Sequence, residues 1–165
     1  MTGLRTNVAD LLHHPGARRP VVIEAPVEGL AAGVARVAES DPLVVDVVLE
    51  RVPEGIVVRG QVKGHWTGDC SRCLRAIDRE LALPMNELFE TEPLEGETYP
   101  LEGDVIDLAL PVRDAVLLEL PLAPLCTEDC AGLCPVCGTD RNENACDCEA
   151  APSDERWAPL RELRL

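Results

Sequence analysis

Leu43-Val-Val-Asp-Val-Val-Leu-Glu-Arg51, followed after Pro53-Glu-Gly55 by Ile56-Val-Val-Arg-Gly-Gln-Val-Lys-Gly-His-Trp66, carries the strongest structural signal in this chain. In each run, side chains of one character recur at every second position, which is typical of β-strands with one buried face. A Pro/Gly turn between two such runs predicts an antiparallel hairpin. The expected inward positions are Leu43, Val45, Val47, Leu49, Val58, Gly60, Val62, Gly64 and Trp66.

Further elements are expected on both sides of this hairpin. Val21–Ala25 predicts another strand, and a third hairpin-region strand is expected from Leu74 towards Leu83. Residues 7–14 could form a short helix or turn, whereas residues 90–104, which are rich in Glu, Pro and Gly, predict an acidic loop. The sequence therefore predicts an α+β fold, with a mainly antiparallel β-sheet or partly open barrel and a packed helix.

The packed helix is expected after residue 107. Asp107 is a good N-cap candidate, Pro111 is tolerated in the first turn, and Pro121 ends the run. Its apolar positions form one stripe that should pack on the sheet. They are Leu108, Val112, Ala115, Val116 and Leu120.

The eight cysteines fall into four close pairs with none left over. Paired thiolates on tight turns are the usual ligands of structural zinc, which takes four of them in a tetrahedron. The pattern predicts two zinc ions, although disulfides, redox-active thiols or an iron–sulfur cluster are alternatives. The pairs are Cys70-x-x-Cys73, Cys126-x-x-x-Cys130, Cys134-x-x-Cys137 and Cys146-x-Cys148.

Two groupings of these pairs are compatible with the spacing. The local grouping joins Cys70 and Cys73 with Cys126 and Cys130 as site one, and Cys134 and Cys137 with Cys146 and Cys148 as site two. The crossed grouping exchanges the second and third pairs. We expect the local one, because residues 134–148 could wrap an ion with little loop-closure cost. It implies a β core domain over 1–125 and a cysteine-rich, zinc-binding C-terminal segment over 126–165.

The expected zinc is structural and the expected protein is not an enzyme. His13, His14 and His65 follow no ligand-like spacing with the cysteines, whereas catalytic zinc usually includes histidine or carboxylate ligands. Phosphate-binding, dinucleotide-binding, nucleophile-elbow and zinc-protease motifs are missing from the sequence, so no small-molecule substrate is expected.

Charge is unevenly distributed along this acidic chain, whose formal net charge is −15. Residues 1–84 hold 11 acidic and 10 basic side chains, but residues 85–155 hold 18 acidic and two basic ones. Such a segment repels phosphate backbones and favours a basic protein partner. No run of eighteen apolar residues and no signal-peptide region is present, so we expect a soluble, cytoplasmic protein without membrane contact.

A row of basic side chains on the outer face of the hairpin has two interpretations. Arg59, Lys63 and His65 could pair with Asp46 and Glu50 of the neighbouring strand. Alternatively, they could face RNA. The candidate RNA-binding residues are Arg59, Lys63, His65, Arg72 and Arg75. Because aromatics make up only 2% of the chain, base-stacking surfaces are scarce.

Three segments of the chain resemble the YceD family, the large ribosomal RNA subunit accumulation proteins, in their actinobacterial form. They are Gly68-Asp-Cys-Ser-Arg-Cys-Leu74, Asp107-Leu-Ala-Leu-Pro-Val-Arg-Asp-Ala-Val-Leu-Leu-Glu-Leu-Pro121 and Leu125-Cys-Thr-Glu-Asp-Cys-Ala-Gly-Leu-Cys-Pro-Val-Cys-Gly138. Arg156-Trp-Ala-Pro-Leu-Arg-Glu-Leu163 also fits this pattern. The resemblance covers nearly the whole chain.

This resemblance implies a role in accumulation or processing of 23S ribosomal RNA and in assembly of the large ribosomal subunit. The expected partners are a basic ribosomal protein, the pre-50S particle or the 23S precursor. Some family members resemble the chain at Cys70, Cys73 and Cys130 but have histidine near Cys126 and lack the last four cysteines. That variation implies a site one and a separate, added site two.

Overall fold

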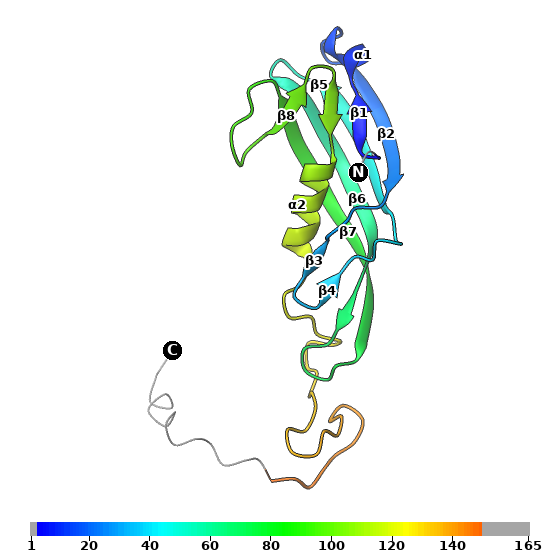
Figure 1. Ribbon diagram of the computed structural model, residues 1–165, viewed down its shortest axis with the longest axis vertical. Helices are drawn as coiled ribbons and strands as arrows, with labels where there is room; N and C mark the ends of the chain where they lie inside the picture. Colours follow the sequence, from blue (N-terminus) through cyan, green and yellow to red (C-terminus); the bar gives the residue numbers. More distant parts are fainter. Residues whose placement is uncertain (1–2, 150–165) are drawn as a thin grey trace, which may run out of the picture.

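Two 15-residue strands form the centre of the sheet, β6 (Gly55–Asp69) and β7 (Ala76–Glu90). They pair antiparallel over their whole length, from Gly55 opposite Glu90 to Asp69 opposite Ala76. β5 (Leu43–Arg51) pairs with β6 as the predicted hairpin. The computed structural model describes residues 3–149. In Figure 1 they form a strongly curled half-barrel with the cysteine-bearing segments at its lower end.

The remaining strands extend this sheet in both directions. On one side, the order runs from β7 through β8 and β9 to β1, and on the other, β2 pairs with β5. β4 and β3 form a small hairpin whose Arg36 pairs with Thr67 of β6. The bounds are β1 (Arg5–Asn7), β2 (Arg18–Ala25), β3 (Ala31–Ala32), β4 (Ala35–Arg36), β8 (Tyr99–Glu102) and β9 (Val105–Asp107).

Alternation along β5 and β6 turns one face of the hairpin inward, as predicted. Leu43, Val45, Val47 and Leu49 are buried, as are Val58, Val62 and Trp66 of β6. Glycine at position 60 lets the strands approach closely, because a Cβ there would fall on the carbonyl oxygen of Asp46. The core on the concave side of the sheet is built mainly from aliphatic side chains, with Trp66 and Phe89 among them.

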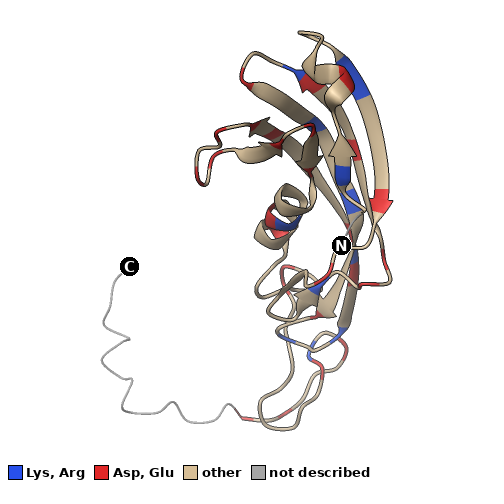
Figure 2. Cartoon of the chain, turned by 45° about the horizontal axis from the view of Figure 1, so that its top comes forward, with Lys and Arg blue, Asp and Glu red and all other residues tan. Residues whose placement is uncertain are grey.

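Helix α2 (Ala109–Glu119) fills the concave side of the half-barrel and packs against β7 (Figures 1 and 2). Its predicted stripe is confirmed: Leu108, Val112, Val116 and Leu120 are buried and Ala115 is partly buried. The predicted helix cap differs in detail. Leu108 occupies the N-cap position without a side-chain cap, while Asp107 Oδ1 accepts a hydrogen bond from Ala109 N at 2.9 Å.

Two features of the sheet differ from the sequence prediction. The acidic stretch 90–104 is not all loop, because it contains β8, which runs parallel to the end of β7. This parallel pair makes the sheet mixed.

The short helix expected in residues 7–14 is α1 (Ala9–Leu12). Within residues 3–149, neither helix combines the length and apolar character needed to cross a bilayer.

Candidate metal centres

The first cysteine cluster closes the lower end of the β6–β7 hairpin. Cys70 follows β6, Cys73 precedes β7, and Cys126 and Cys130 arrive from the segment after α2. The turn is closed by Leu74 N to Cys70 O at 2.9 Å and Cys70 N to Arg75 O at 2.8 Å. The cluster thus joins parts of the chain more than fifty residues apart, and three of its cysteines are buried.

The second cluster is formed within a short segment of chain. Cys134 and Cys137 lie on a tight turn closed by Gly138 N to Cys134 O at 2.9 Å. Gly138 has φ 74°, a conformation that glycine adopts without steric cost. Cys146 and Cys148 return to this turn. Cys134 is buried, but Cys137 is exposed, so this cluster is more open to solvent.

The spacing of the sulfur atoms fits a tetrahedral metal ion. In each cluster, the four Sγ atoms lie within 4.8 Å of one another. Cys70 and Cys130 are 3.8 Å apart and Cys73 and Cys126 are 3.6 Å apart. A tetrahedron with Zn–S bonds of about 2.3 Å has edges of roughly 3.8 Å, whereas a disulfide bond is about 2.05 Å long. All eight cysteines are free, and both clusters could bind a metal ion.

The pKa values of the thiols within the first cluster diverge, because burial, backbone N–H donors and neighbouring sulfurs act differently on each one. Burial opposes ionisation of Cys70, but N–H donors from Cys126, Cys73 and Arg72 lower its pKa to about 6. For Cys73, the Arg75 N–H lowers the pKa, but burial and the neighbouring sulfurs outweigh it and raise the pKa to about 12.

The second cluster shows the same division. N–H groups of Cys137 and Val136 lower the pKa of Cys134 to about 6, while the neighbouring Cys137 sulfur raises that of Cys148 to about 12. Thiolates packed this closely repel one another, so a dication is the species that would allow all four to ionise. The donor set therefore fits zinc chemically as well as geometrically.

Arginine side chains surround both clusters. Arg72 donates to the carbonyl oxygens of Cys130 at 2.9 Å and Glu128 at 3.3 Å. Arg79 donates to those of Cys126 at 2.9 Å and Leu125 at 3.1 Å. The neighbouring sulfurs of Cys134 and Cys146 raise the pKa of the Arg141 guanidinium. These cations hold the cysteine segments in place and offset the negative charge of thiolates.

The structure places the five candidate RNA-binding residues in two different settings. Arg72 and Arg75 are engaged with the cysteine segments, since Arg75 Nη2 contacts Asp140 at 3.0 Å and Glu143 at 2.7 Å. Arg59 contacts Glu50 at 3.6 Å and donates to Asn86 at 3.0 Å. Lys63 and His65 are exposed on the outer face of β6. All five side chains are exposed.

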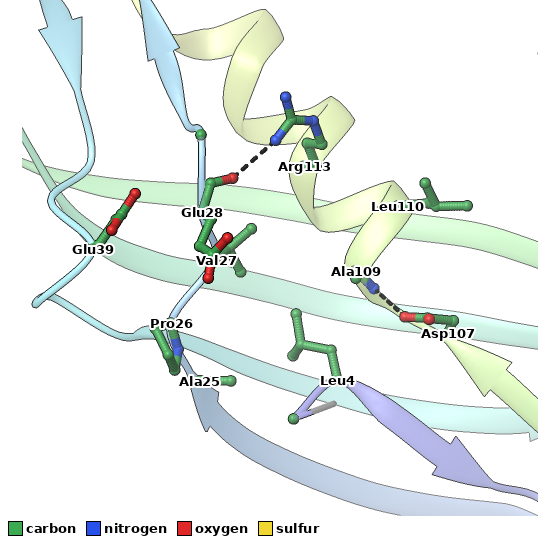
Figure 3. Close-up of a pocket in the computed structure, with 12 residues that line it drawn as sticks. Leu4, Ala25, Pro26, Val27, Glu28, Glu39, Asp107, Ala109, Leu110 and Arg113 are labelled. Carbon is green, nitrogen blue, oxygen red and sulfur yellow. Dashed lines mark hydrogen bonds between the residues drawn. The ribbon is translucent and has the colours of Figure 1, made fainter. Parts of the chain in front are cut away.

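A separate groove of about 950 Å³ lies at the N-terminal end of α2. Figure 3 shows Leu4, Ala25, Pro26 and Val27 facing it from one side and α2 from the other. Arg113 Nη1 bridges the two sides by donating to the Glu28 carbonyl at 2.9 Å. No sequence motif marked this groove, because its lining comes from four distant segments.

Comparison with known proteins identifies relatives of this chain. A family model described as "Large ribosomal RNA subunit accumulation protein YceD" matches residues 58–164. Uncharacterised proteins of Mycobacterium bovis and Mycobacterium tuberculosis are each 36% identical over 132 residues, 72% of this chain. The match covers 60% of each of those proteins, so the chain spans less than two thirds of their length.

A plant protein extends the same relationship. The chloroplastic large ribosomal RNA subunit accumulation protein YCED homolog 1 of Arabidopsis thaliana is 37% identical over 59 residues, which is 36% of this chain and 18% of that protein. No solved structure matches the chain at a significant level. The family model covers both cysteine clusters and well over half of the chain, so the chain belongs to the YceD family.

Proposed function

We propose that this protein is a non-enzymatic, cytoplasmic factor that supports 23S ribosomal RNA accumulation and processing by holding a basic protein of the assembling large ribosomal subunit. The family supplies the process. The distribution of charge is the observation that indicates what kind of partner the protein holds, because residues 85–155 contain 18 acidic and two basic side chains. Such a surface attracts basic proteins and repels RNA phosphates.

The β7–β8 connection is the best candidate for the contact surface. Glu92, Glu95 and Glu97 are exposed there, and Leu94 is 59% exposed among them. Figure 2 shows acidic residues on this loop, which projects from the half-barrel. Within residues 85–149, the ion pairs involve other acids, namely Glu102, Asp107, Asp140 and Glu143. The loop therefore offers charge that no described basic side chain neutralises.

The proposal gives the cysteine clusters an architectural role. Each would hold one zinc ion with four thiolates, a closed set that leaves no position for a substrate. In this scheme residues 1–125 form the β core, and residues 126–165 form a segment that the ions fold and fasten to it. Residues 150–165 lie outside the described part of the chain.

The test is affinity purification at low salt, followed by identification of the recovered protein and RNA. The unmodified chain should recover a basic ribosomal protein or pre-50S particles, and Glu92→Gln, Glu95→Gln and Glu97→Gln together should reduce that recovery at least tenfold. Glu24→Gln, Glu39→Gln and Asp41→Asn, which are exposed acids in the balanced half of the chain, form the charge-matched control. Equal losses in both variants, or recovery of no ribosomal component, would refute the proposal.

A second candidate function is direct RNA binding through the outer face of β6, favoured by the exposure of Lys63 and His65. Replacing Arg59 and Lys63 with glutamate should then abolish crosslinking to the 23S precursor, and unchanged crosslinking would exclude this face.

A thiol-based redox switch is a further alternative. Native mass spectrometry that finds two zinc ions and eight reduced thiols would count against it.

A further inference from the structure

The loop inside the second cysteine cluster reaches the first cluster. Between Cys137 and Cys146, this loop carries Asn142, whose side-chain Nδ2 donates to the sulfur of Cys130 at 3.4 Å. Cys130 belongs to the first cluster, although it lies only four residues before Cys134 of the second. A side chain positioned by one candidate metal site thus contacts a ligand atom of the other.

The orientation of the Asn142 amide is determined by its other contacts. Its Oδ1 accepts from Ala131 N at 2.8 Å, and its Nδ2 also donates to Asp140 Oδ1 at 2.6 Å. Turning the amide over would direct Oδ1 at the Asp140 carboxylate and the Cys130 sulfur, and Nδ2 at a backbone N–H. The side-chain N–H of Asn142 therefore faces the Cys130 sulfur.

The same loop is attached to the first cluster through the backbone and through Arg75. Leu133 N donates to Arg72 O at 3.0 Å, and Arg141 N donates to Gly132 O at 2.9 Å. Arg75, in the turn between the first cluster and β7, contacts Asp140 at 3.0 Å and Glu143 at 2.7 Å. These contacts fix the loop at Asp140, and Asp140 in turn holds Asn142 by accepting from its backbone N at 2.8 Å.

We propose that Asn142 is a positioning residue that couples the two metal sites, so that zinc in the second cluster raises the affinity of the first cluster for zinc. An ion bound to the cysteines on either side of residues 138–145 orders this loop and places the Asn142 N–H on Cys130. That hydrogen bond stabilises the Cys130 thiolate in the first site. Linkage makes the effect reciprocal, so loading the first site strengthens the second by the same factor.

The expected size of the coupling follows from the known effect of groups that hydrogen-bond to metal ligands. Loss of a group that hydrogen-bonds a metal ligand typically lowers metal affinity about 10–100-fold. Because an N–H to sulfur bond of 3.4 Å is long, we expect the lower end, about tenfold. The inference rests on the proposed zinc occupancy of both clusters, and it adds that the two ions bind cooperatively.

Native mass spectrometry of the full chain during a zinc titration against a competing chelator tests this coupling. The ratio of the squared one-ion population to the product of the zero-ion and two-ion populations measures cooperativity. We expect Asn142→Ala to raise that ratio about tenfold. Asn144→Ala, in the same loop but without a side-chain hydrogen bond in the described structure, is the matched control and should leave the ratio unchanged.

A second pair of variants measures the first site alone. Replacing Cys146 and Cys148 with serine removes the second site and should lower the zinc affinity of the first about tenfold. Adding Asn142→Ala to this double variant should lower the zinc affinity of the first site no further, because without the second site the Asn142 side chain is no longer held against Cys130. Thermal unfolding at saturating zinc checks that each variant folds.

The outcomes separate the coupling from the proposed occupancy. A wild-type chain that binds fewer than two ions overturns both. Two ions that bind with a ratio insensitive to Asn142→Ala, or a first site equally tight without the second cluster, overturn the coupling alone.

Discussion

Tyr99 and Asp114 are joined by a hydrogen bond in which the phenol Oη lies 3.1 Å from the carboxylate Oδ2. Tyr99 belongs to β8 and Asp114 to α2, so this contact fastens β8, which lies between β7 and β9, to the helix inside the sheet. Tyr99 also packs against Phe89 of β7, with ring centroids 5.5 Å apart. These neighbours keep its hydroxyl in a restricted, negatively charged environment.

The ionisation of Tyr99 provides a direct test of this contact. Burial, the Asp114 hydrogen bond and the charges of Asp114 and Glu87 raise its pKa to about 12, from a usual 10.0. The chain contains a single tyrosine, so phenolate absorbance reports Tyr99 alone. Asp114→Asn should lower the titration midpoint towards 10 without reaching it, because burial remains. A midpoint near 10 in the folded wild type would contradict the arrangement.

The same pKa shift predicts how stability depends on pH. The neutral phenol is favoured in the folded state, so its contribution to stability is fully present below pH 10 and is lost as pH rises towards 12. Urea unfolding between pH 9 and 12 should show a steeper loss of stability in the wild type than in Tyr99→Phe. Parallel pH profiles for the two proteins would contradict this prediction.

Gly60→Ala should destabilise the β5–β6 hairpin. Its new Cβ would meet the Asp46 carbonyl oxygen and Val47 Cα, backbone atoms that cannot turn aside. We expect a loss of about 1–3 kcal/mol in the free energy of unfolding, measured by urea denaturation. Gly64→Ala is the matched control on the same strand, because its Cβ would meet only the flexible end of Leu43. Equal losses in the two variants would show that backbone approach is not the limiting factor.

The hairpin could be predicted because its signal is local. Alternation in residues 43–51 and 56–66 reflects the burial of one face, and each strand pairs with its neighbour in sequence. β1 could not be predicted in the same way. It is three residues long, and its partner β9 lies about one hundred residues away, so neither segment carries an interpretable period. The parallel β7–β8 pair was hidden for a similar reason, within a stretch dominated by glutamate, proline and glycine.

The candidate site was predictable to the level of the cysteine pairs. Short spacing within a pair reflects the geometry of a tight turn, and the structure brings the pairs together in the local grouping. The roles of Arg72 and Arg75 were not predictable from their charge. Both side chains are exposed, as their sequence position suggests, and folding also brings backbone carbonyls and carboxylates from residues 128–143 onto them.

The two cysteine clusters should differ in their effect on stability. The first links the β6–β7 hairpin to the segment after α2 and is largely buried, whereas the second includes the exposed Cys137. Replacing Cys70 and Cys73 with serine should lower the melting temperature far more than replacing Cys146 and Cys148. At saturating zinc, each double variant should retain one ion by native mass spectrometry. Loss of both ions from either variant would contradict two separate sites.

Arg79 should contribute to fastening residues 125–126 to β7. Its guanidinium donates to two backbone carbonyls, and we expect Arg79→Ala to cost about 1 kcal/mol of unfolding free energy. Hydrogen exchange should show faster exchange around Cys126. Arg36→Ala is the control, since within residues 3–149 the exposed Arg36 side chain makes no hydrogen bond or ion pair. Similar effects of both substitutions would exclude a specific anchoring role for Arg79.

The pairing of β1 with β9 has a consequence for synthesis of this protein on the ribosome. Arg5 pairs with Asp107, so β1 waits for its partner until about one hundred further residues have been added. At about 5–20 residues per second, this interval is roughly 5–20 s. During that time β5, β6 and β7 can pair as they emerge, while β1 remains unpaired. The pairing of β1 with β9 is therefore a late event in co-translational folding.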